Sequence, residues 1–113
     1  MASTAAEKFE WLVVVPDHPG ALAQRLEVRP KHFEGLAPNK ENGFWQMGGA
    51  ILDDVPKEGE QLKFRGSAMV ASASSKEEVL EILKNDIYTK SGVWDLEKIQ
   101  IYPFKCAFRV ASS

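Results

Sequence analysis

The segment from Phe9 to Val15 constrains the fold of this chain more than any other. Its aromatic and β-branched residues are typical of a β-strand, and the proline that follows favours a strand end. Successive side chains of a strand point to opposite faces of the sheet, so Val13 lies on one face and Leu12 and Val14 on the other. Both faces are apolar, and the sequence therefore predicts a strand that must be covered on both sides.

The other predicted elements follow in the order helix, strand, strand, helix and strand. Their ranges are 30–42, 44–52, 66–73, 76–84 and 93–102. The resulting order β–α–β–β–α–β is typical of an α+β fold of the ferredoxin-like kind, with four antiparallel strands and both helices on one face. No segment remains to cover the other face, so we expect that face to pair with a second copy of the chain in a homodimer.

The size and composition of the chain narrow its class. Its 113 residues suffice for a single domain, which we place at residues 9–110 after a flexible N-terminal tail at 1–8. A formal net charge of −2 provides no basic surface for nucleic acid, and no apolar run approaches the ~20 residues that span a membrane. The single cysteine, Cys106, can form no internal disulfide or cysteine-built zinc site. These features, with no recognisable targeting segment, predict a cytoplasmic protein.

A histidine and an arginine mark the first helix as a candidate site. Pro30 suits a first helical turn, so we expect the helix to begin there after a short helical approach at 21–28. Arg29, His32 and Leu36 then lie along one edge of the helix. An arginine beside an imidazole at this point would suit an anionic ligand, because a helix start has unpaired N–H groups and a partial positive charge. The alternative is a half-buried histidine beside a solvated arginine.

Other segments carry boundary signals. Pro38 lacks an N–H donor and is expected to kink or divide the first helix before a glycine end signal at Asn42-Gly43. The capping box from Ser75 to Glu78 begins the second helix. Residues 87–92 are expected to form a short connector, and Pro103 is expected to end the last strand.

Two short sequences suggest ligands with less specificity. Gly48-Gly49 lies inside the second strand, where glycine is costly unless another backbone or a ligand comes close. A β-bulge or tight packing against a helix would explain the pair equally well. Asp53-Asp54 is a weak metal signal, because no histidine or further carboxylate lies at ligand spacing. We therefore predict no metal site.

The chain resembles the YciI-like, or YCII-related, proteins over nearly its whole length. The residues that carry the resemblance are Arg29-Pro30-x-His32-x-x-x-Leu36, Gly48-Gly49-Ala50-Ile51-Leu52-Asp53, Gly66-Ser67, Asp86-x-Tyr88-x-x-x-Gly92-Val93 and Pro103-Phe104-Lys105. The resemblance implies a dimeric α+β barrel whose active site is built from a histidine and an aspartate, here His32 and Asp86. In members linked to the degradation of chlorinated aromatics, this pair is associated with the removal of chloride. The sequence departs from the usual pattern at Asn85-Asp86-Ile87, where Asp-Pro is common, and at Pro38.

The residues and the resemblance together predict a small cofactor-independent enzyme that acts on a small organic, anionic molecule. His32 serves as general base or acid, because the unperturbed pKa of a histidine, about 6.5, allows both roles near neutral pH. Asp86 orients the imidazole, and Arg29 binds a carboxylate or enolate of the substrate. The other predicted substrate-binding residues are Gly48, Gly49 and Ser67. The chemistry within reach is isomerisation, elimination or dehydrohalogenation.

Nucleophilic and nucleotide-dependent chemistry have no support in the sequence. Ser67 has no identified base, and Gly48-Gly49 lacks the third glycine and the following helix of a nucleotide-binding loop. The alternative function is a non-catalytic small-molecule-binding or assembly module of the same fold. The two functions differ in one feature, namely whether His32 and Asp86 meet within hydrogen-bond reach in a water-accessible cavity.

Overall fold

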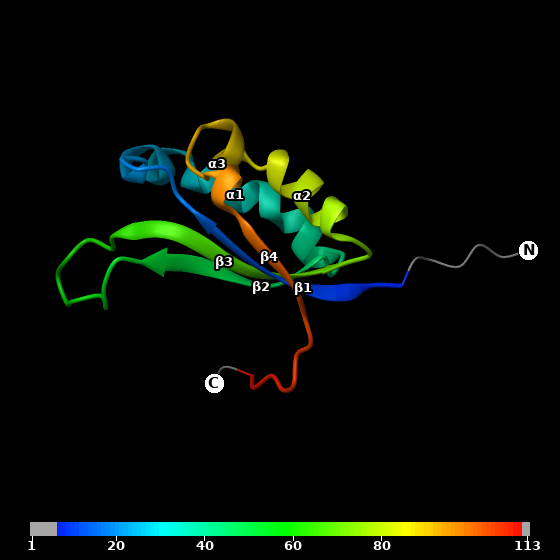
Figure 1. Ribbon diagram of the computed structural model, residues 1–113. Coiled ribbons are helices and arrows are strands. Elements are labelled where there is room, and N and C mark those ends of the chain that lie inside the picture. The colour runs from blue at the N-terminus through cyan, green and yellow to red at the C-terminus, as the bar shows by residue number, and fades with distance from the viewer. Residues whose placement is uncertain (1–6, 112–113) are drawn as a thin grey trace, which may run out of the picture.

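The computed structural model of this protein describes residues 7–111 (Figure 1). Its strands are β1 (Phe9–Pro16), β2 (Trp45–Leu52), β3 (Phe64–Ala73) and β4 (Gln100–Phe104). Its helices are α1 (Leu22–Glu41), α2 (Lys76–Lys84) and the short α3 (Ile87–Lys90), with a 3₁₀ turn η1 (Leu96–Lys98) before β4. Most of the predicted N-terminal tail, residues 1–6, lies outside the described residues. None of the described helices is long and apolar enough to cross a membrane.

The four strands form one antiparallel sheet in the order β2-β3-β1-β4. The central strand β1 pairs with β3 on one side and with β4 on the other, while β2 pairs with β3. Figure 1 shows the helices together on one face of this sheet. The predicted α+β fold of the ferredoxin-like kind is therefore confirmed.

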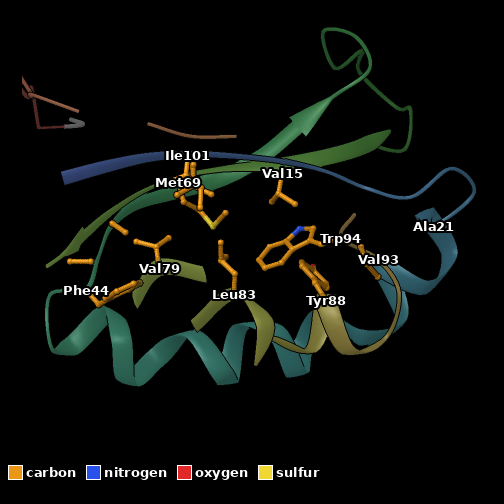
Figure 2. Packing of buried hydrophobic residues seen from close by; sticks show 13 residues of the cluster. Val15, Ala21, Phe44, Met69, Val79, Leu83, Tyr88, Val93, Trp94 and Ile101 are labelled. Carbon is orange, nitrogen blue, oxygen red and sulfur yellow. The ribbon is translucent and has the colours of Figure 1, made fainter. Parts of the chain in front are cut away.

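The core lies between the sheet and the helices. On the inner face of the sheet, Val13 and Val15 of β1 are fully buried. Val79 and Leu83 of α2 belong to the same cluster and are also fully buried. Figure 2 shows Leu83 and Trp94 in one layer between the sheet and the helices. Apolar side chains at strand spacing and at helical spacing thus meet in a single core.

The opposite face of the sheet carries no helix in the part of the chain that Figure 1 describes. Leu12 and Val14 are half-buried there, while Met47 and Tyr102 are 65% and 49% exposed. Strand pairing places these side chains on one continuous face, because directly paired residues point the same way. The chain after β4 turns toward this side without regular structure (Figure 1). β1 thus presents apolar residues on both faces, and only one face is covered by helices.

The first helix differs from the predicted one. α1 begins at Leu22 and runs through Pro30 and Pro38, so the predicted start at Pro30 is wrong and Pro38 does not divide the helix. Both prolines are exposed, and the carbonyl group that each leaves without a helical donor can bind water. The end of the helix agrees with the sequence, because Asn42 is the C-cap and Gly43 follows with a φ of 84°.

Boundaries of later elements also differ from the prediction. Residues 87–90 form the short helix α3 inside the predicted connector. The last strand begins only at Gln100, because η1 and an isolated bridge between Asp17 and Trp94 occupy the preceding residues. Pro103 lies inside β4 and does not end it. β4 is an edge strand, where a missing N–H donor is tolerated.

The start of α2 follows the predicted capping signal in part. The hydroxyl of Ser75 accepts a hydrogen bond from the backbone N–H of Glu78 at 3.1 Å, which is the N-cap half of the box. The carboxylate of Glu78 accepts instead from the hydroxyl of Ser74 at 3.0 Å. The helix therefore begins where its sequence predicts.

Candidate active site

A cavity of about 590 Å³ opens beside α1, α3 and strands β2 and β3. This volume is within the range that holds a small organic ligand. The predicted site residues Arg29, His32, Gly48, Gly49 and Ser67 all line it. Much of the remaining wall is aromatic or apolar and includes Phe33, Trp45, Phe64, Met69, Tyr88 and Trp94.

His32 lines this cavity and forms a hydrogen bond with Asp86, which is not itself among the lining residues. The Nδ1 atom of His32 lies 2.8 Å from Oδ1 of Asp86, and the two side chains are 9% and 11% exposed. An ionised carboxylate can only accept hydrogen bonds, so the proton between them is assigned to Nδ1. In the neutral imidazole, Nε2 then keeps its lone pair. The arrangement can act as a general base through Nε2.

Aromatic rings hold the imidazole of His32 in one orientation. The ring of Tyr88 stacks on it with a centroid distance of 3.8 Å and an interplanar angle of 14°. Trp94 meets the imidazole edge-on, with centroids 5.6 Å apart. Because the imidazole also donates from Nδ1, it keeps little freedom to rotate.

The start of α3 positions the carboxylate of Asp86. Asp86 is the N-cap of this helix, and its Oδ1 accepts a hydrogen bond from the backbone N–H of Tyr88 at 2.8 Å. The same oxygen accepts from His32. This segment reads Asn85-Asp86-Ile87 where Asp-Pro is common in the proteins that the chain resembles. The difference does not move the Asp86 carboxylate away from the imidazole.

Arg25, which its sequence context did not mark, connects three elements around the cavity. Its Nη1 donates to both carboxylate oxygens of Asp17, at 2.8 and 3.0 Å, and its Nη2 donates to Oγ of Ser67 at 2.9 Å. The indole Nε1 of Trp94 donates to the same Oγ at 3.1 Å. Arg25 is 4% exposed, so it is a buried positive charge, and among residues 7–111 its carboxylate partner is Asp17.

Burial and the charge of Arg25 have opposite effects on the pKa of Asp17, the carboxylate that pairs with Arg25. Burial raises the pKa of Asp17 above its ordinary value of 3.8, while the charge and hydrogen bonds of Arg25 act in the opposite direction with smaller effect. A buried ion pair of this kind contributes little net stability. Its effect is positional, because it fixes the guanidinium that holds Ser67.

Ser67 lies where β3 passes very close to β1. A Cβ atom on the neighbouring Gly66 would lie 2.8 Å from the carbonyl oxygen of Val15, so only glycine fits there. The Ser67 hydroxyl accepts from Arg25 and Trp94, and these two hydrogen bonds occupy both of its lone pairs. Its own proton has no acceptor among residues 7–111 and is available to a ligand in the cavity.

Arg29 borders the cavity as an exposed cation. Its guanidinium lies 5.1 Å from the ring centroid of Phe33 and 5.3 Å from that of Phe64. Within residues 7–111 it has no carboxylate partner. Because α1 begins at Leu22, Arg29 and His32 lie in the middle of the helix, and the predicted anion site at a helix start is wrong. The positive charge offered to an anion is that of the guanidinium itself.

Gly48 and Gly49 form part of the cavity wall on β2. A Cβ atom at Gly48 would lie 3.3 Å from Cγ of Met69, whereas one at Gly49 would have no atom within 4 Å. An irregularity of the strand register lies earlier, between Trp45 and Met47. At these two positions the wall of the cavity is therefore formed by backbone without a side chain.

Tyr88 is a second residue of the site that was recognised only as part of a motif. Burial raises the pKa of Tyr88 above its ordinary value of 10.0; Arg25 and Arg29 lower the pKa, and Asp86 and Asp17 raise it. The phenol is therefore protonated at neutral pH. Its position two residues after the predicted site aspartate was the available signal.

Asp53 and Asp54 do not line this cavity. Asp53 lies 3.7 Å from Arg65, and Asp54 accepts from the backbone N–H of Val55 at 2.7 Å. Across the described residues, no group of three His, Cys, Asp or Glu side chains is placed to hold a metal ion.

Comparison with known proteins agrees with this architecture. The family model of the YCII-related domain matches residues 9–105. Fusaric acid biosynthesis protein 2 of Gibberella fujikuroi is 40% identical over 101 residues, which are 89% of this chain and 97% of that protein. Aspartate kinase FUB3 of Fusarium oxysporum f. sp. lycopersici is 40% identical over 103 residues, or 91% of this chain, but the chain spans only 19% of its length.

One solved structure shares both the fold and part of the sequence. It is the 5-chloro-2-hydroxyhydroquinone dehydrochlorinase TftG from Burkholderia phenoliruptrix AC1100, in complex with 2,5-dihydroxybenzoquinone. The TM-score is 0.72 and the sequence identity is 27%. The match covers 85% of this chain and 93% of that chain, so it includes nearly the whole domain.

Proposed function

This chain belongs to the YCII-related family, and we propose that it is a small, cofactor-independent cytoplasmic enzyme that performs acid and base chemistry on a small organic anion. The observation that carries the proposal is the 2.8 Å hydrogen bond between Asp86 and His32, which lines an open cavity. A histidine that donated to a backbone carbonyl in a filled core could not reach a substrate and could not act as a general base. The similarity to a dehydrochlorinase supports chemistry of this kind.

His32 acts as the base in this proposal. Its Nε2 takes a proton from the substrate, while its Nδ1–H stays hydrogen-bonded to Asp86. The carboxylate keeps the imidazole in the required tautomer and stabilises the imidazolium that forms. In an isomerisation the proton returns to another atom of the substrate. In an elimination the electron pair left behind expels an anion.

The cavity suits a flat, oxygen-rich molecule. The rings of Phe33 and Phe64 supply flat walls, and Arg29 supplies a positive charge for an anionic oxygen. The hydroxyl of Ser67 supplies a further donor. The 2,5-dihydroxybenzoquinone bound to TftG is such a molecule and supports the same class of ligand here. The relative named for the biosynthesis of fusaric acid supports a small metabolite as the substrate.

The enzyme is proposed to be a homodimer that is joined through the outer face of the sheet. The support is the apolar character of that face, where Leu12 and Val14 are half-buried and Tyr102 is 49% exposed. Light scattering should give about twice the chain mass of 12.6 kDa. Val14→Lys should give a folded monomer, whereas Val13→Lys should lose the fold, because Val13 is fully buried under the helices. A monomeric wild-type protein would contradict the dimer.

Nitrogen NMR of the two histidines tests the hydrogen bond between His32 and Asp86, on which the proposal of an enzyme depends. In the wild-type protein at mildly alkaline pH, His32 should carry its proton on Nδ1 and keep a lone pair on Nε2. Asp86→Ala removes the acceptor, so His32 should shift toward the tautomer with the proton on Nε2. His18, whose side chain is 48% exposed, should not respond and serves as the control.

Chloride release from 5-chloro-2-hydroxyhydroquinone, the compound in the name of TftG, tests turnover. The wild-type protein should accelerate it, and His32→Asn should lower the rate by about 100- to 10,000-fold. Equal rates for the two proteins, with a proton on Nε2 of His32 in the wild type, would favour a non-catalytic binding module.

A further inference from the structure

The hydroxyl of Tyr88 is not explained by packing. Tyr88 is 1% exposed, yet its hydroxyl forms no hydrogen bond with any residue between 7 and 111. Every fully buried side-chain oxygen or nitrogen in the same part of the chain has a partner, so this hydroxyl must still reach solvent. The space it reaches is the cavity that Tyr88 lines. A phenol held there is an unused hydrogen-bonding group that faces the site.

The groups that position His32 also position Tyr88. The tyrosine ring stacks on the imidazole with centroids 3.8 Å apart, and its backbone N–H donates to Oδ1 of Asp86 at 2.8 Å. On the Arg25 side, the guanidinium lies 4.8 Å from the ring centroid. The tyrosine ring that carries the hydroxyl is therefore held against the imidazole before any ligand binds, and such preorganisation is the condition for electrostatic stabilisation of a reacting group.

We propose that Tyr88 is a further catalytic residue, whose hydroxyl donates a hydrogen bond to a carbonyl oxygen of the substrate while His32 takes a proton from the adjacent carbon. The C–H bond breaks, a bond forms between that proton and Nε2 of His32, and the electron pair moves onto the oxygen as an enolate. The phenol stabilises this enolate more than the starting carbonyl, because hydrogen bonds to charged oxygens are stronger.

This assignment rests on the proposed function and names its substrate class. The substrates are carbonyl compounds that carry a C–H bond on the saturated carbon next to the carbonyl group and can therefore form an enolate. The phenol can serve as the donor because it is protonated at neutral pH. Arg29, as the exposed cation of the same cavity, adds attraction for the enolate charge.

Two matched variants isolate the hydroxyl. Tyr88→Phe removes one oxygen atom and keeps the ring that stacks on His32. Because that oxygen has no partner among the described residues, its removal leaves no donor or acceptor unsatisfied, and the thermal midpoint should not fall. Tyr102→Phe makes the same change at the other of the chain's two tyrosines, which is 49% exposed on the outer face of the sheet.

Calorimetric titration with 2,5-dihydroxybenzoquinone measures the contact, because this probe presents several oxygen acceptors on one flat ring. Tyr88→Phe should bind it about 10- to 100-fold more weakly than the wild type, and Tyr102→Phe should bind it as the wild type does. The His32 tautomer should be the same in all three proteins. Equal binding by Tyr88→Phe, or no binding by the wild type, would overturn the assignment.

The assignment of Tyr88 and the His32–Asp86 base fail in different ways. Weaker binding by Tyr88→Phe, together with a wild-type His32 that carries its proton on Nε2, would support the Tyr88 contact and remove the base. Unchanged binding with the proton on Nδ1 would do the reverse. A lower thermal midpoint or an altered His32 tautomer in Tyr88→Phe would indicate a structural role for the phenol and would also overturn the assignment.

Discussion

α1 and α2 lie on the same face of the sheet, yet they bury opposite kinds of side chain (Figure 1). The 20-residue α1 buries Arg25 and His32. The 9-residue α2 buries Val79 and Leu83. A helix packed on a sheet usually turns an apolar stripe inward. α2 follows this rule, whereas α1 turns its buried polar side chains toward a cavity.

This difference separates stability from function along one face of the sheet. Under α2 the face is covered by the buried apolar side chains of the core. Beside α1 it stays open, and hydrogen bonds hold the groups that border the opening. α2 therefore contributes side chains to the core, and α1 contributes side chains to the site. Changes to either side should have separable effects, which can be tested in turn.

The largest change in stability is expected on the polar side. Asp17→Ala leaves Arg25 buried without its carboxylate, and an unpaired buried charge lowers the free energy of unfolding by about 3–5 kcal/mol. Adding Arg25→Met to this variant should restore most of the loss, because the charge is then absent as well. Urea unfolding measures both variants. An Asp17→Ala protein as stable as the wild type would mean that water reaches the guanidinium.

On the apolar side the expected loss is slightly smaller. Leu83→Ala leaves a cavity in the core and should lower the free energy of unfolding by about 2–5 kcal/mol. The His32 tautomer and the binding of 2,5-dihydroxybenzoquinone should not change. Val55→Ala, at a side chain that is 76% exposed, is the control and should change stability by less than about 0.5 kcal/mol. Altered probe binding in Leu83→Ala would show that the two sides are coupled.

The apolar side could be predicted from the sequence more completely than the polar side. The stripe of α2 and its cap at Ser75 are local signals, and the structure follows both. For α1 the local signals favour a start at Pro30, but the helix extends back to Leu22. The extension brings Arg25 to Asp17 and to Ser67, which is 42 positions away. No local rule contains these tertiary contacts.

The site was predictable only where a resemblance joined distant residues. His32 drew attention by itself, but Asp86 is 54 positions away and no spacing rule links the two. Arg25 lies one helical turn before Arg29, and this relation becomes visible only when the helix is extended. Tyr88 stood in a motif of the resemblance without a predicted role, since an aromatic residue at such a position is usually core. In this structure it is both core and cavity wall.

A smaller effect is expected from the glycines of β2. Gly49→Ala should raise the free energy of unfolding by about 0.5–1 kcal/mol, because glycine weakens a strand and a Cβ atom there meets nothing within 4 Å. Gly48→Ala should stabilise less, since its Cβ atom would lie 3.3 Å from Met69. Thermal unfolding compares the two variants. A loss of stability in Gly49→Ala would indicate that a second copy approaches this backbone closely.

The smallest expected effect is a pH dependence of the free energy of unfolding that is caused by Tyr88, which belongs both to the core and to the cavity wall. The folded pKa of Tyr88 lies above the ordinary value of 10.0, so the folded state keeps a proton that the unfolded chain releases. The resulting stability is complete below about pH 10 and is lost as the pH rises through the folded pKa. Between about pH 9 and about pH 11, urea unfolding should show a larger loss for the wild type than for Tyr88→Phe. Equal losses would mean that burial does not raise the pKa of Tyr88 in the folded protein.

One oxygen atom, Oδ1 of Asp86, meets two demands at once, because it accepts from His32 and caps α3. A cap favours Ser, Thr, Asp or Asn, whereas an imidazolium is stabilised by Asp or Glu. Aspartate alone belongs to both sets. At position 86, aspartate is therefore the one residue type that meets both requirements. Asn at this position would keep the cap and lose the negative charge, whereas Glu would keep the charge and lose the cap, so no replacement meets both demands.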